Sequence, residues 1–511
     1  MNMNMHLPIL PILLPLLAGI ALLVLGTRRI ALQRAIGLLS CTGLVVLAAL
    51  LAVQADDGGT RTYLVGNWAA HLGIALVADR LAAIMLLATS LLALPCLLFA
   101  TGGWDRRAMH FHALFQFQLM GLNGAFLTGD LFNLFVFFEV LLIASYGLLL
   151  SGGRGARLRV GLQYVAFNIT ASTLFLVAVG LIYGLTGALN MAELAARVAA
   201  VPAAEAAPLK AAAGLLLVVF CAKAALLPMS FWLPETYARS PAAVAALFAV
   251  MTKLGIYAVL RVYGLVFGSE AGALAGLAWP WLLPLGAATL VLATLGALAA
   301  ASLRQLAAYL VLGSAATLFI ALGLASAEAV GAGLYYLLHS TLAGGAMFLL
   351  ADLVRRQRDN AGDSLRKLDR LQHKALLGAL FAVAAVSVAG LPPLSGFIGK
   401  FGLLAAVPDA QAGWLWPVIL LTSLLTLVAL AAAGSQVFWR EGGEAPAPGR
   451  VPRLRRTEVG ATVALLALGL LLAVFGGPVM RYAQATGAQL MAPADYIQSV
   501  RAALPRPGVD P

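Results

Sequence analysis

The chain has 511 residues, of which 62% are hydrophobic and 11% are charged, and its formal net charge is +12. A soluble globular protein carries about 25% charged residues, so this composition excludes water as the main solvent of the folded chain. The excess of Lys and Arg does not indicate a nucleic-acid partner, because these residues lie almost wholly in short segments between apolar runs, which is a signal of membrane topology.

Apolar runs of about 18 residues or more recur along the whole chain, and each is long enough to cross a hydrocarbon core. They are rich in Leu, Ala and Gly without the alternation of a membrane β-strand, which favours an α-helical bundle over a barrel. The sequence therefore predicts an all-α polytopic membrane protein with about fourteen transmembrane helices. In chain order, the predicted spans are residues 7–26, 33–53, 81–100, 109–128, 131–151, 160–186, 208–228, 241–267, 278–299, 305–325, 329–352, 376–406, 412–438 and 458–480.

The first span, residues 7–26, lacks both a basic leader and a small-residue cleavage site, so it is predicted to be a retained helix rather than a signal peptide. Basic residues concentrate in the loops after the odd-numbered spans, while the other loops hold chiefly Arg61 and Arg197 beside several acidic residues. The positive-inside rule then places the basic loops in the cytoplasm and both termini on the outer, periplasmic side of a bacterial inner membrane.

No predicted loop is long enough for a catalytic domain, and the glycine-rich residues 152–155 lack the strand, helix and Lys-Ser/Thr context of a phosphate loop. The cysteines have neither paired spacing nor a CxxC motif, so no disulfide, metal site or cofactor is predicted from Cys41, Cys96 and Cys221. ATP hydrolysis and hydride transfer are therefore excluded. We expect the energy to arrive as an ion gradient or through a partner.

A carboxylate stands near the middle of the fifth span. Glu139 lies in the string GDLFNLFVFFEVLLIASYGLL, in which Asp130 marks the outer end of the helix. A charged side chain at mid-membrane costs about 2.5 to 3.5 kcal/mol on insertion scales and is by default a functional candidate. Glu139 must be either protonated or paired with a buried cation.

Two lysines provide candidate cations. Lys223 lies five residues before Pro228, which cannot donate a backbone hydrogen bond and so interrupts the helix. A charged group beside a break at mid-depth is typical of transport sites. Lys253 lies twelve residues past Pro241 and far from either end of its span, whereas a snorkelling lysine stays near the interface. Lys253 is therefore also predicted to be buried.

The same pattern returns in the second half of the chain. The string VSVAGLPPLSGFIGKFGLL is interrupted at Pro392 and Pro393 and carries Lys400 beyond the break, and the preceding span carries His339. Two apolar segments with a proline break and a lysine, five spans apart, predict two inverted five-helix repeats, spans four to eight and nine to thirteen. The predicted domains are an N-terminal three-helix segment (1–108), the first repeat (109–267), the second repeat (278–438) and a C-terminal helix with a tail (458–511).

These ionisable groups can act together as a lateral proton wire. An imidazole passes protons near neutral pH, which makes His339 a relay candidate rather than a structural histidine. Burial disfavours the charged form of a lysine, and a nearby carboxylate favours it, so separating Glu139 from Lys223 would push a proton along the wire. The ordered series is Glu139, Lys223, Lys253, His339 and Lys400. Gln116, Gln118, Asn123, Gln163 and Asn168 could hold water or orient charges, but the role that we predict for these five is interhelical hydrogen bonding.

At these strings the chain resembles the large antiporter-like subunits shared by respiratory complex I and the Mrp-type (Pha-type) multisubunit Na+(K+)/H+ antiporters. The resemblance covers essentially the whole chain, and GDLFNLFVFFEVLLIASYGLL is most similar to the D-type subunits of the Mrp antiporters. It implies that Glu139 and Lys223 are the family's glutamate–lysine pair, Lys253 its connecting lysine and His339 its central histidine. It also implies that Lys400 is the terminal lysine, and that other membrane subunits, protons and Na+ or K+ are the partners.

Three functions remain open from the sequence. The first is a proton-translocating subunit of a monovalent cation/proton antiporter, and the second is a proton-pumping subunit of an NADH:quinone oxidoreductase or membrane-bound hydrogenase. A membrane scaffold without transport is disfavoured, because a scaffold has no need of lysines at mid-membrane. No cluster of carboxylates defines a Na+ site on the chain, so that site is expected on another subunit.

Overall fold

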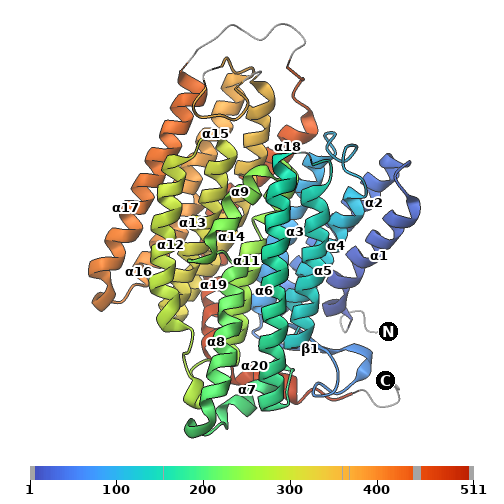
Figure 1. Cartoon of the computed structure of the whole chain (residues 1–511), viewed down its shortest axis with the longest axis vertical. Helices are drawn as coiled ribbons and strands as arrows, with labels where there is room; N and C mark the ends of the chain where they lie inside the picture. The colour runs from blue at the N-terminus through green and yellow to red at the C-terminus, as the bar shows by residue number, and fades with distance from the viewer. Residues whose placement is uncertain (1–5, 154, 359–360, 368, 441–450, 506–511) are drawn as a thin grey trace.

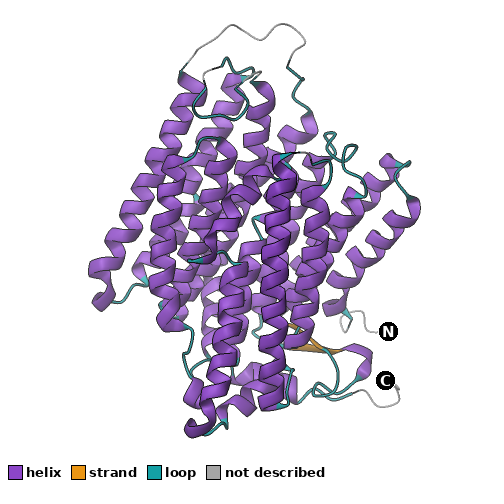
Figure 2. Cartoon of the chain, viewed as in Figure 1, coloured by secondary structure: helices purple, strands orange, loops and turns teal. Residues whose placement is uncertain are grey.

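A computed structural model describes residues 6–153, 155–358, 361–367, 369–440 and 451–505. The described chain is a bundle of long helices, and its strands are confined to one short hairpin (Figure 2). The N-terminal segment comprises η2 (Leu7–Ile9), α1 (Leu10–Leu25), α2 (Ile30–Ala55), β1 (Arg61–Leu64), η3 (Val65–Asn67), β2 (Ala75–Ala78) and α3 (Arg80–Ala100). Strands β1 and β2 pair antiparallel, with Arg61 opposite Ala78.

The first half of the remaining bundle contains a helix that stops within the membrane region. Its elements are α4 (Phe111–Leu127), α5 (Leu131–Leu150), α6 (Ala156–Thr186), α7 (Met191–Ala199), η4 (Ala203–Glu205), α8 (Ala206–Lys223), η5 (Met229–Phe231), α9 (Trp232–Arg239), α10 (Ala242–Phe248), α11 (Met251–Leu265) and η6 (Gly272–Leu274). The break separates α8 from η5 and α9 and includes Pro228, as the sequence predicts.

The second half has its own broken helix. Its elements are α12 (Trp279–Ala299), α13 (Leu303–Gly323), α14 (Ala327–Gln357), α15 (Lys374–Ala389), α16 (Ser395–Ala405), α17 (Asp409–Gly434) and the π-helical turn η7 (Ser435–Trp439). The break between α15 and α16 contains Pro392 and Pro393. The chain then continues through α18 (Arg456–Val474), α19 (Gly476–Met491) and α20 (Ala494–Arg501) (Figure 1).

The observed helices match the predicted spans. Among the described residues, 12 helical segments are long and apolar enough to cross a membrane, and each overlaps one predicted span. The two other predicted spans correspond to α4, which has 17 residues, and to α15 with α16, which have 16 and 11. The prediction of an all-α polytopic membrane protein is therefore confirmed.

Polar side chains begin several of the long helices. The side chain of Asp79 accepts from the amide of Ala82 at the start of α3, and Asp130 does the same for Asn133 at the start of α5. Ser302 and Ser326 cap α13 and α14. Because the first amides of a helix have no intrahelical partner, these caps satisfy donors that would otherwise be costly near a membrane.

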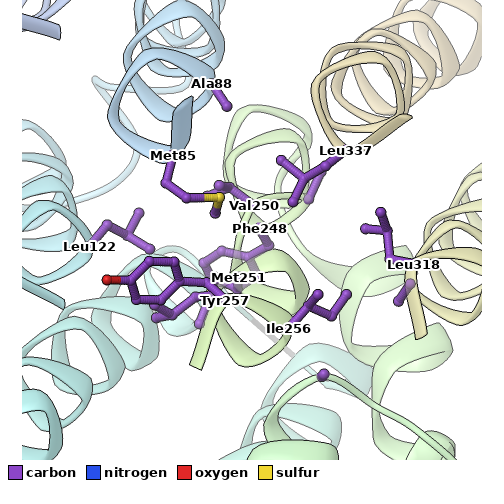
Figure 3. Packing of buried hydrophobic residues seen from close by; sticks show 14 of the residues in the cluster. Met85, Ala88, Leu122, Phe248, Val250, Met251, Ile256, Tyr257, Leu318 and Leu337 are labelled. Carbon is purple, nitrogen blue, oxygen red and sulfur yellow. The ribbon is translucent and has the colours of Figure 1, made fainter. Parts of the chain in front are cut away.

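The interior of the bundle joins the N-terminal segment to both halves. Figure 3 shows Met85 of α3, Leu122 of α4, Tyr257 of α11, Leu318 of α13 and Leu337 of α14 converging on one apolar cluster. Helix α14 lies at the centre and packs against α10, α13, α16, α18 and α19. The residues of α14 that carry chemistry are consequently shielded from lipid.

The two ends of the bundle differ in charge. We define the basic face as the end at which α3 and α14 finish and α6, α13 and α18 begin, where many of the arginines gather. The opposite end carries the hairpin, and both η2 and α20 contact β1 there. The two ends of the described chain thus lie at the same end of the bundle (Figure 1).

Candidate functional site

The break after α8 is held by side chains from neighbouring elements. Lys223 is the last residue of α8. The indole of Trp232 donates to the carbonyl of Ala222 at 3.1 Å, and the amide of Leu227 donates to the hydroxyl of Thr289 in α12 at 3.0 Å. The carbonyl of Ala222 and the amide of Leu227, which the break leaves without helical partners, are therefore hydrogen-bonded to side chains. The partner of Leu227 lies in the second half of the bundle.

The ammonium of Lys223 is surrounded by oxygen atoms of helix α6. Its side chain is only 5% exposed, and its Nζ lies 3.0 Å from the hydroxyl of Ser172. The same Nζ lies 3.4 Å from both the carbonyl and the side-chain oxygen of Asn168. The ammonium therefore exchanges water for neutral oxygens, which satisfy its hydrogen bonds but do not neutralise its charge.

Glu139 lies on the outward side of α5. Its Oε1 atom is buried and has no hydrogen-bond partner among the described residues, although the residue as a whole is half-buried. Glu139 makes no ion-pair contact with Lys223, but its charge acts on that lysine through space. Beside it, Phe138 packs against Phe175 and Phe220 of α6 and α8. Glu139 and Lys223 are thus not in contact in this structure, although the charge of Glu139 acts on Lys223.

Lys253 is fully buried in α11. Its Nζ lies 2.7 Å from the hydroxyl of Ser314 in α13, and that hydroxyl in turn donates to the carbonyl of Val311 at 2.7 Å. No carboxylate pairs with Lys253 in the described part of the chain. Lys253 is therefore a buried amine whose side-chain partner is a neutral hydroxyl.

His339 lies against the second broken helix. Its ring is 2% exposed, and Nδ1 lies 2.9 Å from the hydroxyl of Ser395, the first residue of α16. A Cβ atom added to Gly396 would collide with the carbonyl of Ser387 and lie 2.9 Å from Nε2 of His339. Only glycine permits this approach, so the backbone of α16 contacts the imidazole directly. The charges of Lys400 and Lys253 both act on His339.

Lys400 caps the end of α15. Its Nζ donates to the carbonyl of Ala389, the last residue of that helix, at 2.9 Å, and to the hydroxyl of Ser423 in α17 at 3.2 Å. Carbonyls at a helix C-terminus carry the negative end of the macrodipole, so this position favours a cation. The lysine beyond the second break therefore interacts with the break itself.

A small cavity links two of these groups. Its volume is about 40 Å³, and its walls include Ser314, Tyr336, Lys400 and Ser423. A cavity of this size with several polar walls is large enough for a water molecule. Because Ser314 is the partner of Lys253, the cavity joins the surroundings of Lys253 to Lys400.

The structure thus places Lys253, His339 and Lys400 in one connected region and Lys223 with Glu139 in another. No described side chain bridges Lys223 to Lys253 by hydrogen bonds. Among the described residues, no three His, Cys, Asp or Glu side chains gather as a possible metal site.

The five Asn and Gln residues that were predicted to form interhelical hydrogen bonds differ in their contacts. Ser40 donates to Gln116 at 2.8 Å and Asn123 donates to the carbonyl of Pro11 at 2.8 Å, which confirms their interhelical role. Asn168 contacts Lys223. The prediction was wrong for Gln118, whose buried amide has no partner among the described residues, and for Gln163, which is exposed on α6.

Sequence reasoning missed a buried ion pair at the end opposite the basic face. Arg261 in α11 binds Asp79 through two hydrogen bonds of 2.6 and 2.7 Å. The guanidinium also lies over the rings of Tyr257 and Tyr496, 5.4 and 5.2 Å from their centroids. An arginine within an apolar span was the available signal, but its partner is 182 residues away.

A second missed cluster lies in the loop after α3. Asp105 accepts from Arg34 at 2.7 Å and lies 3.3 Å from Nε2 of His112. Burial raises the pKa of Asp105, but the hydrogen bonds from His112 and Arg34 outweigh it, and the pKa falls to about 2. The carboxylate therefore stays ionised and fastens this loop to α2 and α4.

Comparisons with known proteins agree with the fold and with the family resemblance. The family described as NADH:quinone oxidoreductase/Mrp antiporter matches residues 128–426. The chain is 42% identical to the D subunit of a probable K+/H+ antiporter of Rhizobium meliloti, with 98% of each chain covered. It is 37% identical to the D subunit of a Na+/H+ antiporter of Alkalihalophilus pseudofirmus, with 97% of this chain and 99% of that protein covered.

A solved structure shows the same architecture. A chain of the Mrp complex from a Dietzia species superposes with a TM-score of 0.86 at 28% identity, covering 98% of this chain and 100% of that one. Sequence and fold therefore agree over nearly the entire length. The chain belongs to the NADH:quinone oxidoreductase/Mrp antiporter family and is the D-type subunit of an Mrp-type cation/proton antiporter, a transporter component rather than an enzyme.

Proposed function

We propose that this chain carries protons for a multisubunit Na+ or K+/proton antiporter along the series Glu139, Lys223, Lys253, His339 and Lys400. The observation that carries the proposal is the pair of buried lysines, Lys223 and Lys253, whose hydrogen-bond partners among the described residues are neutral oxygens. A charge held this way in an apolar interior is costly, so such an amine is poised to release its proton.

A hydroxyl group lies beside four of the five proposed relay residues. Ser172, Ser314, Ser395 and Ser423 each contact one member of the series, and a hydroxyl both donates and accepts hydrogen bonds. The cavity beside Ser314 and Lys400 has room for water, which would complete the path from Lys253. In this scheme a proton moves toward Lys400 when the charge of Glu139 ceases to hold it at Lys223.

The two-repeat organisation is part of the proposal, with residues 109–267 and 278–438 as inverted copies, residues 1–108 before them and residues 458–511 after them. It is supported by the two breaks, each of which interrupts an apolar helix and has a lysine beside it. The short halves α9 and α16 also point toward opposite ends of the bundle (Figure 1). An offset of five spans reverses the direction of the second copy in the membrane.

Another membrane subunit is proposed to cover the outward face of α5. Phe132 and Ile143 on that face are 43% and 64% exposed, and the half-buried Glu139 lies between them in the sequence. A partly exposed carboxyl at mid-membrane is costly beside lipid, and a neighbouring subunit that covers this face would remove that contact. The similar Dietzia chain comes from such a complex.

The orientation and the cation site are also part of the proposal. The positive-inside rule supports a cytoplasmic basic face and periplasmic termini in an inner membrane. Relatives of the chain are named for either K+ or Na+, and the described residues offer no acidic cluster, so we place the cation site on another subunit.

The proposal is tested in everted vesicles from an antiporter-deficient strain that expresses the whole operon. Addition of Na+ or K+ should collapse the proton gradient in the wild type and fail to do so with Lys223→Met or Glu139→Gln. Lys210→Met is the matched control, because Lys210 is an exposed lysine of the same helix. Activity that survives both relay changes at equal protein level would contradict the proton path.

A further inference from the structure

The basic face contains a cavity that the transport path does not use. Its volume is about 320 Å³, and seven arginines and two carboxylates, Asp352 and Glu458, stand among its walls. This volume is at the lower end of the range typical of small-molecule pockets. It opens where α3, α6, α10, α13, α14 and α18 meet, so its walls come from the N-terminal segment, both halves of the bundle and the C-terminal helix.

Some of the arginines are already paired. Arg304 binds Asp363 at 2.8 Å, and Arg355 binds Asp352 at 2.7 Å. Arg356 is shared between Asp352 and Glu458, at 3.0 and 2.9 Å. Both acidic groups of the cavity are therefore already in ion pairs with these arginines, Glu458 through one of its two oxygens.

The four other arginines of the cavity are not neutralised by an ion pair. Arg107, Arg157, Arg453 and Arg455 make no ion pair within the described ranges. Arg157 donates through Nε to the carbonyl of Arg239 at 2.9 Å and lies 5.3 Å from the ring centroid of Trp104, which leaves its two terminal nitrogens available. Burial disfavours the charge of Arg157 most, the like charges of Arg304 and Arg355 add to this, and Asp352 opposes it. An anion between these arginines would favour their charged forms.

Two buried donors in the same wall lack acceptors. The indole N–H of Trp104 and the Nη2 atom of Arg356 have no hydrogen-bond partner in the described chain. A buried donor without an acceptor is rare in a folded protein and often marks a bound group. The Oε2 atom of Glu458 is the one unpartnered acceptor of the cavity among the described residues, and it belongs to a carboxylate whose other oxygen binds Arg356.

The backbone also brings the charged groups close. A Cβ atom on Gly102 would collide with Oε1 of Glu458, so the loop after α3 lies directly on α18. The carbonyl of Gly102 accepts from Arg455. The cavity therefore lies at a close contact between the loop after α3 and α18, with the exposed Arg107 and Arg453 at its rim.

We propose that this cavity binds a phosphate-bearing anion. Arginine forks match phosphate oxygens in geometry and charge, and basic pockets between membrane helices on the cytoplasmic side bind acidic headgroups. The phosphate can belong to an anionic phospholipid or to a soluble phosphate, and both sources present the same oxygens.

An anion bound in this cavity would affect transport because the helices that form the cavity also carry residues of the proposed proton path. Helix α6 carries Asn168 and Ser172, α13 carries Ser314 and α14 carries His339, and each of these helices has an end in the cavity wall. A bound anion fastens these ends together. We therefore expect the ligand to raise both the stability of the complex and its antiport rate.

The soluble source is tested by measuring the thermal midpoint of the purified, complete antiporter complex in phosphate and in chloride at equal ionic strength. Phosphate should raise the midpoint of the wild type, and Arg107→Gln/Arg157→Gln/Arg453→Gln should weaken the apparent phosphate affinity at least about tenfold. Arg106→Gln/Arg366→Gln/Arg370→Gln is the matched control, because these exposed arginines do not line the cavity. The control should keep the wild-type response.

The lipid source is tested with the same complexes in phosphatidylcholine vesicles with or without phosphatidylglycerol. If the ligand is a headgroup, phosphatidylglycerol raises the antiport rate and added phosphate has no further effect. If it is soluble, phosphate acts in pure phosphatidylcholine. Either result supports the site, provided that the cavity variant loses the effect and the control variant keeps it.

The proposal is overturned if neither phosphate nor phosphatidylglycerol changes the wild-type complex, or if the control variant loses the response as fully as the cavity variant. A response of the single chain that disappears in the assembled complex also overturns it, because a neighbouring subunit then fills the cavity. If the triple variant does not assemble, Trp104→Phe and Arg453→Gln replace it. Trp104→Phe removes one donor and keeps the ring under Arg157, so it should weaken the response without abolishing assembly.

Discussion

The ammonium of Lys253 lies 2.7 Å from the hydroxyl of Ser314, and this contact links α11 to α13 in the interior of the bundle. Ser314 also lines the cavity that reaches Lys400. One hydroxyl therefore contacts the amine of Lys253 on one side and a space large enough for water on the other. Substitution of Ser314 is therefore the most direct test of the proposed proton path between Lys253 and Lys400.

Ser314→Ala should lower antiport activity by about tenfold or more, because a buried amine without its hydroxyl partner loses about 1–3 kcal/mol of hydrogen bonding. Ser314→Thr keeps the hydroxyl and should retain most of the activity. Cation-induced loss of the proton gradient in everted vesicles measures both. Equal loss in the two variants would point to packing rather than proton transfer. Thr426→Val, which changes a hydroxyl in the same cavity wall away from Lys253, is the control.

Gly396→Ala should destabilise the contact between α16 and α14 by about 1–3 kcal/mol, because the added methyl group meets the carbonyl of Ser387 and the ring of His339. The thermal midpoint of the purified complex and the antiport rate should fall together. Gly413→Ala is the matched control, because a Cβ atom at Gly413 in α17 meets nothing within 4 Å. An unchanged midpoint in Gly396→Ala would contradict the close approach.

Removal of one partner from the pair between Arg261 and Asp79 should cost about 3–5 kcal/mol, because the remaining charge is left buried. Asp79→Asn and Arg261→Gln should each lower the amount of folded protein in the membrane. The double variant should recover part of the loss, since no lone charge remains. Fluorescence-detected size exclusion of the tagged complex measures this, and a double variant that is as poor as the sum of the singles would show that the two residues act independently.

Acid should weaken the loop after α3 in a defined pH window. The pKa of Asp105 is lowered from its usual value to about 2, so its ionised form stabilises the folded state at pH values above the unfolded pKa. This contribution is present at neutral pH and is lost as the pH falls from about 4 through about 2. Asp105→Asn should lower the thermal midpoint at pH 7 and flatten its dependence on pH in that window. Asp409→Asn, an exposed carboxylate at the start of α17, should leave the dependence unchanged.

The spans could be predicted well from the sequence because apolar length and helix breaks are local properties. Glu139, Lys223, Lys253 and His339 stood out for the same reason, since each interrupts an apolar run. The assignment of these residues to a proton path stays a prediction. The two helix breaks, by contrast, are confirmed at the positions that the prolines predicted.

The partners of these residues could not be predicted from the sequence. A serine in an apolar helix commonly bonds its own backbone, so nothing in the sequence marked Ser172 or Ser314 as the residue facing a lysine. The contact between Lys253 and Ser314 spans 61 residues, and its existence depends on how α11 and α13 pack. Likewise, the amide side chains gave no local sign of whether they would face a neighbouring helix, as Gln116 does, or the outside of the bundle, as Gln163 does.

The hydrogen bond from the amide of Leu227 to Thr289 gives the first break an anchor in the opposite half of the molecule. The two halves are consequently joined at the break itself. Helix α12 also packs along α13, which carries the partner of Lys253. Thr289 is thus a fixed point between the two halves, because its hydroxyl accepts from the first break while its helix packs against α13.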